Sequence, residues 1–551
     1  MLNLVDRSSK TVPLMGQASK TFDAVVVGAG FGGMYMAHLL RSKGFTVRGF
    51  ERGSGVGGTW FWNRYPGCRC DVESMEYSYQ FSDGLQQDWQ WSERYSAQPE
   101  ILAYAEHVAH RFEILDLFTF NTSVEGADFD DLSRLWTVRT AAGEAVQARY
   151  VIMATGCLST ANMPDIAGLD LFDGQLHHTG AWPAEGLDVS GLRVAVVGTG
   201  SSAIQSIPHI AAQAQHLTVF QRTPNYSIPA QNGPIDTTRV AEIKANYEEY
   251  RRRNKNQPAA FGADFPRNGD SVFDATPEER ESRFEAHWGY GGFMFMGAFA
   301  DLGLDPQANA YAAEFVRSKI RATVKDPATA ELLCPDTIIG CKRLCADTGY
   351  FETYNRDNVT LVDISAHPIE KLTRSGLVVN KALYEFDAII FATGFDAMTG
   401  SLLKMEIRGE GGLTLKDKWA DGPKTYLGLM TAGFPNLFMM TGPGSPSVLA
   451  NMITGVEQHA DYICDLLTWS HKEGFSEIKA EPVAEQTWVE VVNMRSQATL
   501  YPRCNSWYLG ANVPGKPRVF MPYLGFPDYV ARLQEIRDAR YEGFVFAAAG
   551  G

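Results

Sequence analysis

The chain has 551 residues, and its 49 Lys and Arg against 64 Asp and Glu give a formal net charge of −15. This length predicts two to four domains with ample buried core. The 45% hydrophobic content excludes general disorder. The acidic balance argues against nucleic acid and against an anionic membrane as partners, because both require concentrated Lys and Arg.

Neither a targeting signal nor a membrane span is expected. The first twenty residues contain no apolar stretch of signal-peptide length. The longest uncharged run, 425–456, includes eight Gly or Pro residues, which suits loops near a ligand better than a spanning helix. The eight cysteines form no C-x-x-C pair and no set with zinc spacing. We interpret them as free thiols in a reducing cytoplasm, and we predict no metal site.

The first glycine-rich motif follows a buried strand, 22–27. Gly28, Gly30 and Gly33 form G-x-G-x-x-G at the start of an apolar-periodic helix. These glycines allow a tight turn, the approach of a pyrophosphate to backbone N–H groups, and close helix packing. A second strand then delivers Glu51, 23 residues after Gly28, where a ribose-binding carboxylate is expected. The position of this motif near the N-terminus and the carboxylate of Glu51 together predict an FAD site.

The second glycine-rich motif repeats the arrangement with one difference. A strand, 192–197, leads into Gly198-Thr199-Gly200 and a further helix. At the end of the next strand stands Arg222, where the first motif has a carboxylate. A guanidinium favours a 2′-phosphate, which a carboxylate would repel, so this half should prefer NADP(H) to NAD(H). The alternative is that Arg222 is a solvated surface arginine.

Two further strands, beginning at Tyr150 and Phe386, each end in Ala-Thr-Gly and bracket the second glycine motif. They indicate that the chain leaves one domain near residue 156 and returns to it near residue 390. We therefore predict an α/β fold with two Rossmann-like dinucleotide-binding domains. The FAD domain comprises 1–155 and 390–551, the latter with an active-site loop and a C-terminal segment, and the NADP domain comprises 156–389.

Residues 230–335 of the NADP domain have a helical pattern and are predicted to form an insertion. Thr276-Pro277-Glu278-Glu279 combines an N-cap threonine, a proline at the first helical position and a capping-box glutamate. The segments 240–253 and 309–324 fit amphipathic helices. The charged residues of this insertion are interpreted as a solvated face.

Two dinucleotide sites in one chain predict hydride transfer from NADPH to the flavin. A disulfide reductase with this arrangement would need a redox-active cysteine pair, usually C-x-x-C or C-x4-C. The candidate pairs, Cys68 with Cys70 and Cys341 with Cys345, have neither spacing. Reduced flavin is therefore expected to pass electrons to oxygen or to a small acceptor.

Two longer motifs carry a family resemblance. Residues 172–183 match F-x-G-x-x-x-H-x-x-x-W-P, and residues 57–71 match a second pattern, GGTWFWNRYPGCRCD. From about residue 20 to its C-terminus the chain resembles the type I Baeyer–Villiger flavin monooxygenases. It is most similar to the phenylacetone and steroid branch, beside the cyclohexanone enzymes. Flavin monooxygenases that oxidise nitrogen or sulfur share the dinucleotide motifs, but their fingerprint usually lacks Trp-Pro.

The resemblance implies a reaction in which NADPH reduces the bound FAD and the reduced flavin then reacts with O2. One oxygen atom is inserted next to the carbonyl of an apolar ketone, which is cyclic, aryl or steroid-like, and an ester or lactone results. In this reaction a C4a-peroxyflavin anion attacks the carbonyl. The protein must stabilise that anion, polarise the carbonyl and exclude water. Arginine suits the task because it keeps its proton at working pH.

The resemblance also implies residue roles. It assigns Arg343 to charge stabilisation, Asp71 to pairing with Arg343, and Lys342 to the 2′-phosphate beside Arg222. By spacing alone, Lys342-Arg343 would be an ordinary basic dipeptide. His178 of the fingerprint is implied to couple the domains structurally, and it is left out of the catalytic set with Phe172 and Trp182.

The cofactor and substrate contacts implied in this way are numerous. The FAD contacts are Gly28, Gly30, Gly33, Glu51, Thr59, Trp60, Phe61, Trp62, Asp71, Tyr77, Val124 and Met452. The NADP contacts are Arg69, Cys70, Gly198, Thr199, Gly200, Ser201, Ser202, Gln205, Arg222, Thr223, Lys342, Arg343 and Trp507. The substrate contacts are Ser447, Val448 and Leu449. Cys157 and the single glycine at Gly525 depart from the family pattern and leave the substrate range open.

Two alternative functions stay open at this stage. A heteroatom-oxidising flavin monooxygenase is disfavoured by Trp182-Pro183 together with Arg343. A non-catalytic dinucleotide sensor would not need Arg343, Asp71 and an apolar loop together. The expected partners are a small-molecule ketone and O2, without nucleic acid or membrane. The ketone, the regiochemistry and the oligomeric state are not predicted.

Overall fold

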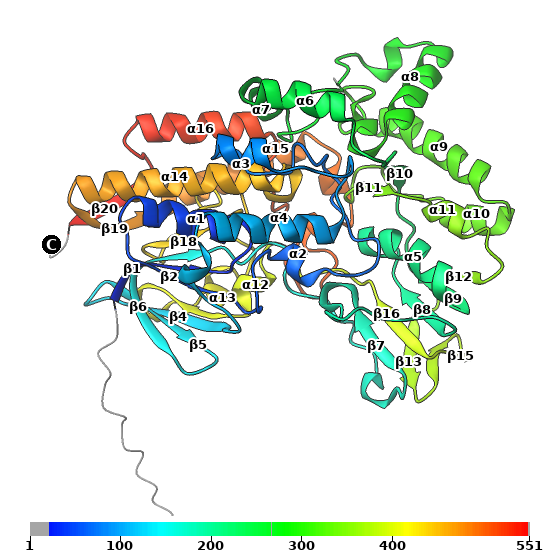
Figure 1. The fold of residues 1–551 in the computed structure, drawn as a ribbon, viewed down its shortest axis with the longest axis horizontal. Coiled ribbons are helices and arrows are strands. Elements are labelled where there is room, and N and C mark those ends of the chain that lie inside the picture. The colour runs from blue at the N-terminus through cyan, green and yellow to red at the C-terminus, as the bar shows by residue number, and fades with distance from the viewer. Residues whose placement is uncertain (1–20, 266, 549–551) are drawn as a thin grey trace, which may run out of the picture.

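The structure is a computed structural model that describes residues 21–265 and 267–548. The twenty N-terminal residues, for which no targeting signal was predicted, lie outside the described residues. Figure 1 shows two sheet-containing lobes, one around β1 and one around β8; the helices α8 and α9 lie on the side of the second lobe, whereas α6 and α7 lie beside the helices of the first.

The first sheet, within the described residues, has eight strands in the order β17-β4-β5-β6-β1-β2-β3, with β18 paired to β6. β1 is parallel to both β2 and β6, with Ala24 opposite Val47 and Tyr150. The strands are β1 (Thr21–Val27), β2 (Val47–Phe50), β3 (Phe118–Thr119), β4 (Val124–Asp130), β5 (Leu135–Thr140), β6 (Ala145–Met153), β17 (Glu406–Arg408) and β18 (Leu437–Met439).

The second sheet, over the same described residues, has five strands in the order β12-β9-β8-β16-β7, all parallel. These are β7 (Gln175–His178), β8 (Arg193–Val197), β9 (His216–Gln221), β12 (Val359–Asp363) and β16 (Ala388–Phe391). The predicted α/β class with two Rossmann-like units is confirmed. The fingerprint motif supplies the edge strand β7 of the second sheet.

Both glycine motifs meet an Ala-Thr-Gly strand in the same way. Gly28 has φ +103°, and a Cβ there would lie 2.5 Å from the carbonyl oxygen of Ala154. Gly198 has φ +113°, and a Cβ there would lie 2.5 Å from the carbonyl oxygen of Ala392. Only glycine fits both the backbone angle and the close approach. The two glycine motifs therefore make the same backbone contact, each with the alanine of an Ala-Thr-Gly sequence.

The helices around the first sheet are dominated by two that pack on each other. α1 (Phe31–Ser42) lies against α14 (Met452–Lys472), as Figure 1 shows. The others of this part are α2 (Thr59–Trp62), α3 (Asp83–Asp88), α4 (Gln98–Arg111), α12 (Gly400–Leu403), α13 (Leu415–Lys418), α15 (Pro482–Gln497) and α16 (Phe526–Asp538). No helix among the described residues is long and apolar enough to cross a membrane.

The predicted helical pattern between residues 230 and 335 is present. The elements are α6 (Thr237–Ala245), α7 (Tyr247–Lys255), α8 (Pro277–Tyr290), α9 (Pro306–Thr323) and α10 (Pro327–Leu333). The capping box of Thr276 and Glu279 is formed at the start of α8. The expectation of one helix over 240–253 is wrong, because Asn246, at φ −148° and ψ 56°, leaves the helical region and separates α6 from α7.

The second half also contains α5 (Ser201–Gln213), α11 (Tyr350–Thr353), and the paired strands β10 (Ser227–Pro229) and β11 (Cys345–Asp347). Two small antiparallel sheets complete the described fold. They are formed by β13 (Ile369–Thr373), β14 (Gly376–Val379) and β15 (Ala382–Glu385), and by β19 (Phe475–Ala480) and β20 (Phe544–Ala548).

Two of the eight cysteines are not the free thiols that the sequence analysis predicted. The structure joins Cys341 to Cys504 as a disulfide, with Cα atoms 5.8 Å apart, whereas the other six are free. The reading of all eight as free thiols is therefore wrong for this pair. The two residues are 163 positions apart and meet only through the fold, so cysteine spacing carried no signal of the pairing.

Candidate active site

The first glycine turn is built to receive a phosphate. Gly30 is the N-cap residue of α1, and within the described chain this helix has neither a side-chain cap nor an acidic residue in its first turn. Its first N–H groups can therefore bind an anion. Glu51, only 6% exposed, accepts hydrogen bonds from the backbone N–H groups of Ala29 (2.8 Å) and Gly53 (2.6 Å). The carboxylate thus lies across the turn, as a ribose-binding acid requires.

An aromatic segment borders this turn. Gly58 precedes α2, and a Cβ on Gly58 would lie 2.8 Å from the Cα atom of Gly30, so the two motifs touch. The Trp60 indole N–H donates to the Tyr77 hydroxyl at 3.1 Å. The remaining predicted FAD residues are dispersed along the chain: Gly33 in α1, Thr59, Phe61 and Trp62 in α2, Asp71 in the loop after α2, Val124 at the start of β4, and Met452 at the start of α14.

The second glycine turn has the same open helix start. Gly200 is the N-cap residue of α5, which over the described residues has no side-chain cap and no acid in its first turn. A Cβ on Gly200 would meet nothing within 4 Å. The Thr199 hydroxyl donates to the carbonyl of Thr223 at 2.9 Å, which connects the turn to the segment after Arg222.

Residues of α5 also contact the first half of the molecule. The Gln205 side chain accepts from the Tyr65 hydroxyl at 2.9 Å and donates to the carbonyl of Arg69 at 3.1 Å. Ser201 contacts the Cys345 sulfur at 3.2 Å, and Ser202 exchanges a 2.9 Å hydrogen bond with Thr179. The predicted NADP residues of α5 therefore lie at the junction of the two halves.

Arg222 and Lys342 come together as a pair of cations. Burial, and then the nearby charge of Arg222, lowers the pKa of Lys342 below its usual range. Among the residues that the structure describes, neither side chain takes part in an ion pair or hydrogen bond. Two adjacent cations without a protein partner are suited to a phosphate dianion.

Arg343 and Asp71 form the centre of the site. The Arg343 Nε and Nη2 atoms donate to the two Asp71 carboxylate oxygens at 2.7 and 2.8 Å, and Nη1 donates to the Val448 carbonyl at 2.7 Å. The Phe293 ring centre lies 4.7 Å from the guanidinium carbon. Burial alone would lower the pKa of Arg343, but the Asp71 charge and hydrogen bonds raise it above its ordinary value. The guanidinium is therefore permanently charged.

An apolar wall lies beside this pair. Ser447, Val448 and Leu449 form a short helical turn, and the Ser447 hydroxyl contacts the Met398 sulfur at 3.8 Å. The Trp507 and Tyr508 rings are stacked obliquely, 4.2 Å between centres. The cluster that contains these side chains comprises Cys157, Leu158, Ala397, Met398, Val448, Leu449, Met452, Tyr501, Trp507, Tyr508, Leu509, Phe520, Met521 and Leu524. Cys157 and the predicted substrate residues Val448 and Leu449 thus share one apolar surface.

Some predicted coenzyme residues already have protein partners. The Arg69 guanidinium donates to Glu93 (2.6 Å) and to the Tyr95 carbonyl (2.8 Å). Cys70 is 6% exposed, and burial raises the pKa of its thiol well above the ordinary value. The contacts of Arg69 and Cys70 therefore favour a structural role at the junction.

Of the fingerprint residues, Trp182 lies between the halves, and His178 is buried beside it in the chain. His178 is 4% exposed, and its Nδ1 atom accepts from the Gly180 N–H at 2.9 Å. Trp182 lines a cavity of about 190 Å³ with Arg64 and Pro66 of the first half and Ile210 of α5. These contacts are structural ones, in keeping with the exclusion of His178 and Trp182 from the catalytic set.

Sequence reasoning missed several aromatic and cationic neighbours. Phe293, from the helical insertion, lies against Arg343, and Arg52 lies 4.4 Å from the ring centre of Trp62. Arg52 follows Glu51 directly, so its position was a usable signal. Phe293 is fifty positions before Arg343, and no spacing rule could place it there.

Two uncapped dinucleotide turns and a partly buried Arg–Asp pair at their junction define an oxidoreductase that uses two dinucleotides. Comparison with known proteins narrows this class. Residues 25–255 match the family model described as pyridine nucleotide-disulphide oxidoreductase. The glycine motifs lie within that range, whereas a redox-active C-x-x-C or C-x4-C pair does not occur.

Three similar proteins are more specific. A Baeyer–Villiger monooxygenase of Pseudooceanicola batsensis is 42% identical, over 99% of this chain and 98% of that protein. A phenazine N-monooxygenase of Lysobacter antibioticus is also 42% identical, over 95% of this chain and 97% of that protein. The structure of an oxidised steroid monooxygenase bound to NADP superposes with a TM-score of 0.91 at 51% identity, covering 96% of this chain and all of that one.

The chain belongs to the Baeyer–Villiger monooxygenase family. It is an NADPH-dependent flavin monooxygenase with FAD and NADP as cofactors, and its reaction is the oxygenation of a ketone to an ester or lactone. The resemblance inferred from the two long motifs is confirmed.

Proposed function

We propose that the substrate is an apolar ketone, cyclic, aryl or steroid-like, which binds between Arg343 and the wall formed by Val448 and Leu449. The observation that carries this proposal is the charged Arg343–Asp71 pair directly beside an apolar cluster. A ketone presents one polar oxygen on an apolar body, and this combination of surfaces matches it.

The residues present fit both cofactors. The turn with Gly28, Gly30 and Glu51 would hold FAD, because its N–H groups are open and its acid lies across the turn. The turn with Gly198 and Gly200 would hold NADPH, with Arg222 and Lys342 at the 2′-phosphate. When bound, NADPH supplies the hydride and FAD supplies the reduced flavin that reacts with O2.

Arg343 is the proposed catalytic residue. A guanidinium has five N–H groups, and the three described bonds to Asp71 and Val448 leave two of them for oxygen atoms of the reactants. Its charge would stabilise the negative charge that develops on the carbonyl oxygen. Asp71 holds the plane of the guanidinium through two parallel bonds and so directs the remaining N–H groups.

A second candidate function is the oxidation of a heteroatom, favoured by the similarity to a phenazine N-monooxygenase. A nitrogen nucleophile has no carbonyl to polarise, so this reaction would depend less on the charge of Arg343. A panel of ketones, amines and sulfides with product masses distinguishes the two. Ester or lactone as the main product supports the proposal, and N-oxide as the main product contradicts it.

The decisive variant is Arg343→Ala. FAD binding should persist, because it rests on the first glycine turn. NADPH and O2 should still be consumed, with hydrogen peroxide released and ester formation reduced by about 10²–10³-fold or more. Ester formation near the wild-type rate would show that Arg343 does not act on the reacting oxygen atoms.

We also propose the domain division 1–155 with 390–551, and 156–389 with its insertion. Its support is that β17 and β18, which follow the strands of the second sheet in sequence, pair in the first sheet. Limited proteolysis should cut first near residue 156 and in the loop that follows β16 if these are the boundaries, because β16 itself is buried in the second sheet. The cytoplasmic location stays a prediction, which fractionation of the native cells would test.

A further inference from the structure

The helical insertion contacts the chain segment that leads to Lys342 and Arg343. Asn309, on α9, is 2% exposed. Its amide N–H groups donate to the carbonyls of Ile339 (2.9 Å) and Leu302 (2.7 Å), and its oxygen accepts from the N–H of Ile339 (3.1 Å). One side chain therefore binds both backbone groups of Ile339, three residues before Lys342.

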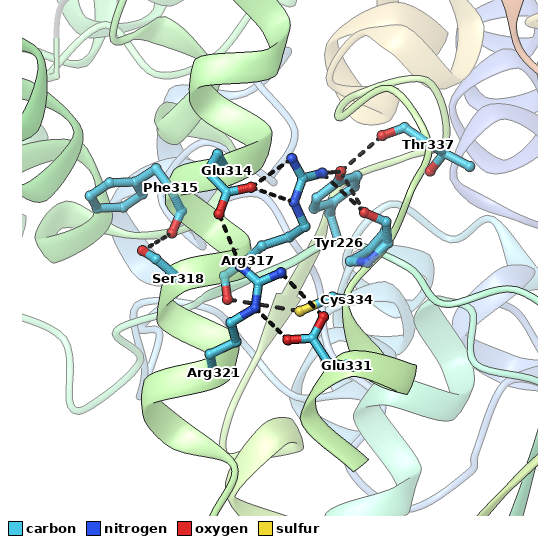
Figure 2. Close-up of polar contacts among 10 residues, drawn as sticks. Tyr226, Glu314, Phe315, Arg317, Ser318, Arg321, Glu331, Cys334 and Thr337 are labelled. Atoms are coloured by element: carbon cyan, nitrogen blue, oxygen red, sulfur yellow. Dashed lines mark hydrogen bonds and ion pairs between the residues drawn. The ribbon is translucent and has the colours of Figure 1, made fainter. Parts of the chain in front are cut away.

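Arg317 makes a second contact on the same side of α9, eight residues further along. Its Nη1 atom donates to the Pro335 carbonyl and to the Tyr226 hydroxyl, both at 3.2 Å. The Tyr226 hydroxyl in turn donates to the carbonyls of Thr337 (2.8 Å) and Pro335 (3.1 Å). Figure 2 shows the two side chains converging on this segment.

Carboxylates of the insertion orient Arg317. Glu314 accepts from Arg317 at 2.8 Å and from Arg321 at 2.9 Å, and Glu331 holds Arg321 at 2.6 Å, as Figure 2 shows. The glutamates are more than half exposed, so these pairs add little stability. Arg317 itself is only 23% exposed and points inward. The interpretation of the insertion's charges as a solvated face therefore holds for Glu314 and Glu331 and is wrong for Arg317 and for Arg251, which is 6% exposed.

This network joins the two segments that deliver the cations of the coenzyme site. Tyr226 follows Arg222 by four residues, and the segment it binds ends at Lys342. Arg222 and Lys342 repel each other, as the lowered pKa of Lys342 reflects after the effect of burial. The backbone holds the two segments together: the Cys345 N–H donates to the Tyr226 carbonyl at 3.3 Å, and β10 pairs with β11. Tyr226 is 3% exposed and is placed to hold these two segments together.

We propose that Tyr226 and Arg317 are positioning residues that keep Lys342 beside Arg222, so that the helical insertion determines the preference for NADPH over NADH. The inference rests on the proposed function in one respect, namely that Arg222 and Lys342 bind the 2′-phosphate. Neither Tyr226 nor Arg317 touches the coenzyme in this proposal. Both act through the segment 335–342.

The test measures binding to the FAD-loaded enzyme by calorimetry, with adenosine 2′,5′-bisphosphate and AMP as probes. Tyr226→Phe removes only the hydroxyl. It should weaken the binding of the bisphosphate by about threefold to tenfold, the size of effect expected for one hydrogen bond, and should leave the binding of AMP unchanged. Arg317→Met should have the same selective effect. Tyr354→Phe is the matched control, because it removes a buried hydroxyl of the same half whose one hydrogen bond among the described residues is to Tyr350. Equal weakening of both probes, or no change, would overturn the proposal.

Lys342→Ala separates this inference from the proposed function. If that variant binds the bisphosphate as wild type does, the 2′-phosphate assignment itself is wrong. If Lys342→Ala binds the bisphosphate more weakly than wild type but Tyr226→Phe does not, only the positioning role fails. In the double variant, Tyr226→Phe should add no further loss to that of Lys342→Ala, because the two act through one contact. Additive losses would show that Tyr226 acts elsewhere.

Discussion

Arg343 and Asp71 are 272 positions apart in the sequence and are joined by two parallel hydrogen bonds of 2.7 and 2.8 Å. Asp71 belongs to the loop that follows α2 in the first half, and Arg343 precedes β11 in the second. The pair therefore connects the two dinucleotide-binding halves. Its charge state and its geometry depend on both halves at once.

Asp71→Asn should uncouple NADPH consumption from oxygenation. Asparagine keeps the shape but removes the charge, and only one of its terminal atoms can accept a hydrogen bond. The Arg343 plane should lose its fixed orientation, and the partly buried cation should lose its charged partner. We expect less ester and more hydrogen peroxide per NADPH, with FAD retained. An unchanged ratio of ester to NADPH would refute the orienting role.

Arg222→Ala should impair the use of NADPH selectively. A charge-assisted hydrogen bond to the 2′-phosphate is worth about 1.5–3 kcal/mol, or roughly tenfold to 150-fold in affinity. The KM for NADPH should rise by a factor in this range, and the KM for NADH should change little. Arg374→Ala, which alters an arginine of the same half whose side chain is 82% exposed, is the control. Equal losses with both coenzymes would contradict the assignment.

Valine at the two helix-start glycines should identify which turn binds which cofactor. Gly30 and Gly200 have φ of −73° and −86°, angles that valine adopts without strain. The effect of each substitution should therefore come from the space that the side chain fills. Gly30→Val should yield protein without yellow colour, whereas Gly200→Val should bind FAD but resist reduction by NADPH. Loss of colour only in the second variant would reverse the assignment.

Glu457 makes the stability of the protein depend on pH. Its carboxylate, 6% exposed on α14, accepts from the N–H groups of Gln80 (2.7 Å) and Phe81 (3.0 Å). Burial raises the pKa of Glu457 from 4.5 to about 7. The folded protein therefore favours the protonated form, so this contribution to stability is complete below about pH 4.5 and is lost as the pH rises to about 7.

Glu457→Gln should remove this dependence while keeping an acceptor for both N–H groups. Relative to wild type, the variant should unfold at a similar temperature near pH 4.5 and at a higher one above pH 7, where the gain approaches roughly 3 kcal/mol. Thermal unfolding followed by circular dichroism at several pH values measures this. Glu490→Gln, at an exposed position of α15, should show no such trend. A constant difference between wild type and Glu457→Gln at all pH values would disprove the explanation.

Much of the fold was predictable because its signals are local. A buried strand, a glycine turn and an uncapped helix follow one another within about twelve residues at both Gly28 and Gly198. The capping box at Thr276 was predictable for the same reason. The break at Asn246 was not, because the apolar period continues through it and only the angles of one residue interrupt the helix.

The sequence by itself determined the two dinucleotide turns, the acid or arginine that follows each, and the family to which the chain belongs. Those features depend on backbone angles and on short spacings, which a residue and its near neighbours decide. Only the tertiary structure decided that Asp71 binds Arg343, that Cys341 pairs with Cys504, that Phe293 lies on the guanidinium, and that Tyr226 and Arg317 bind the segment before Lys342. Each of these contacts joins residues that are far apart in the chain, and such pairs meet only when the packing of whole sheets and helices brings their backbones together.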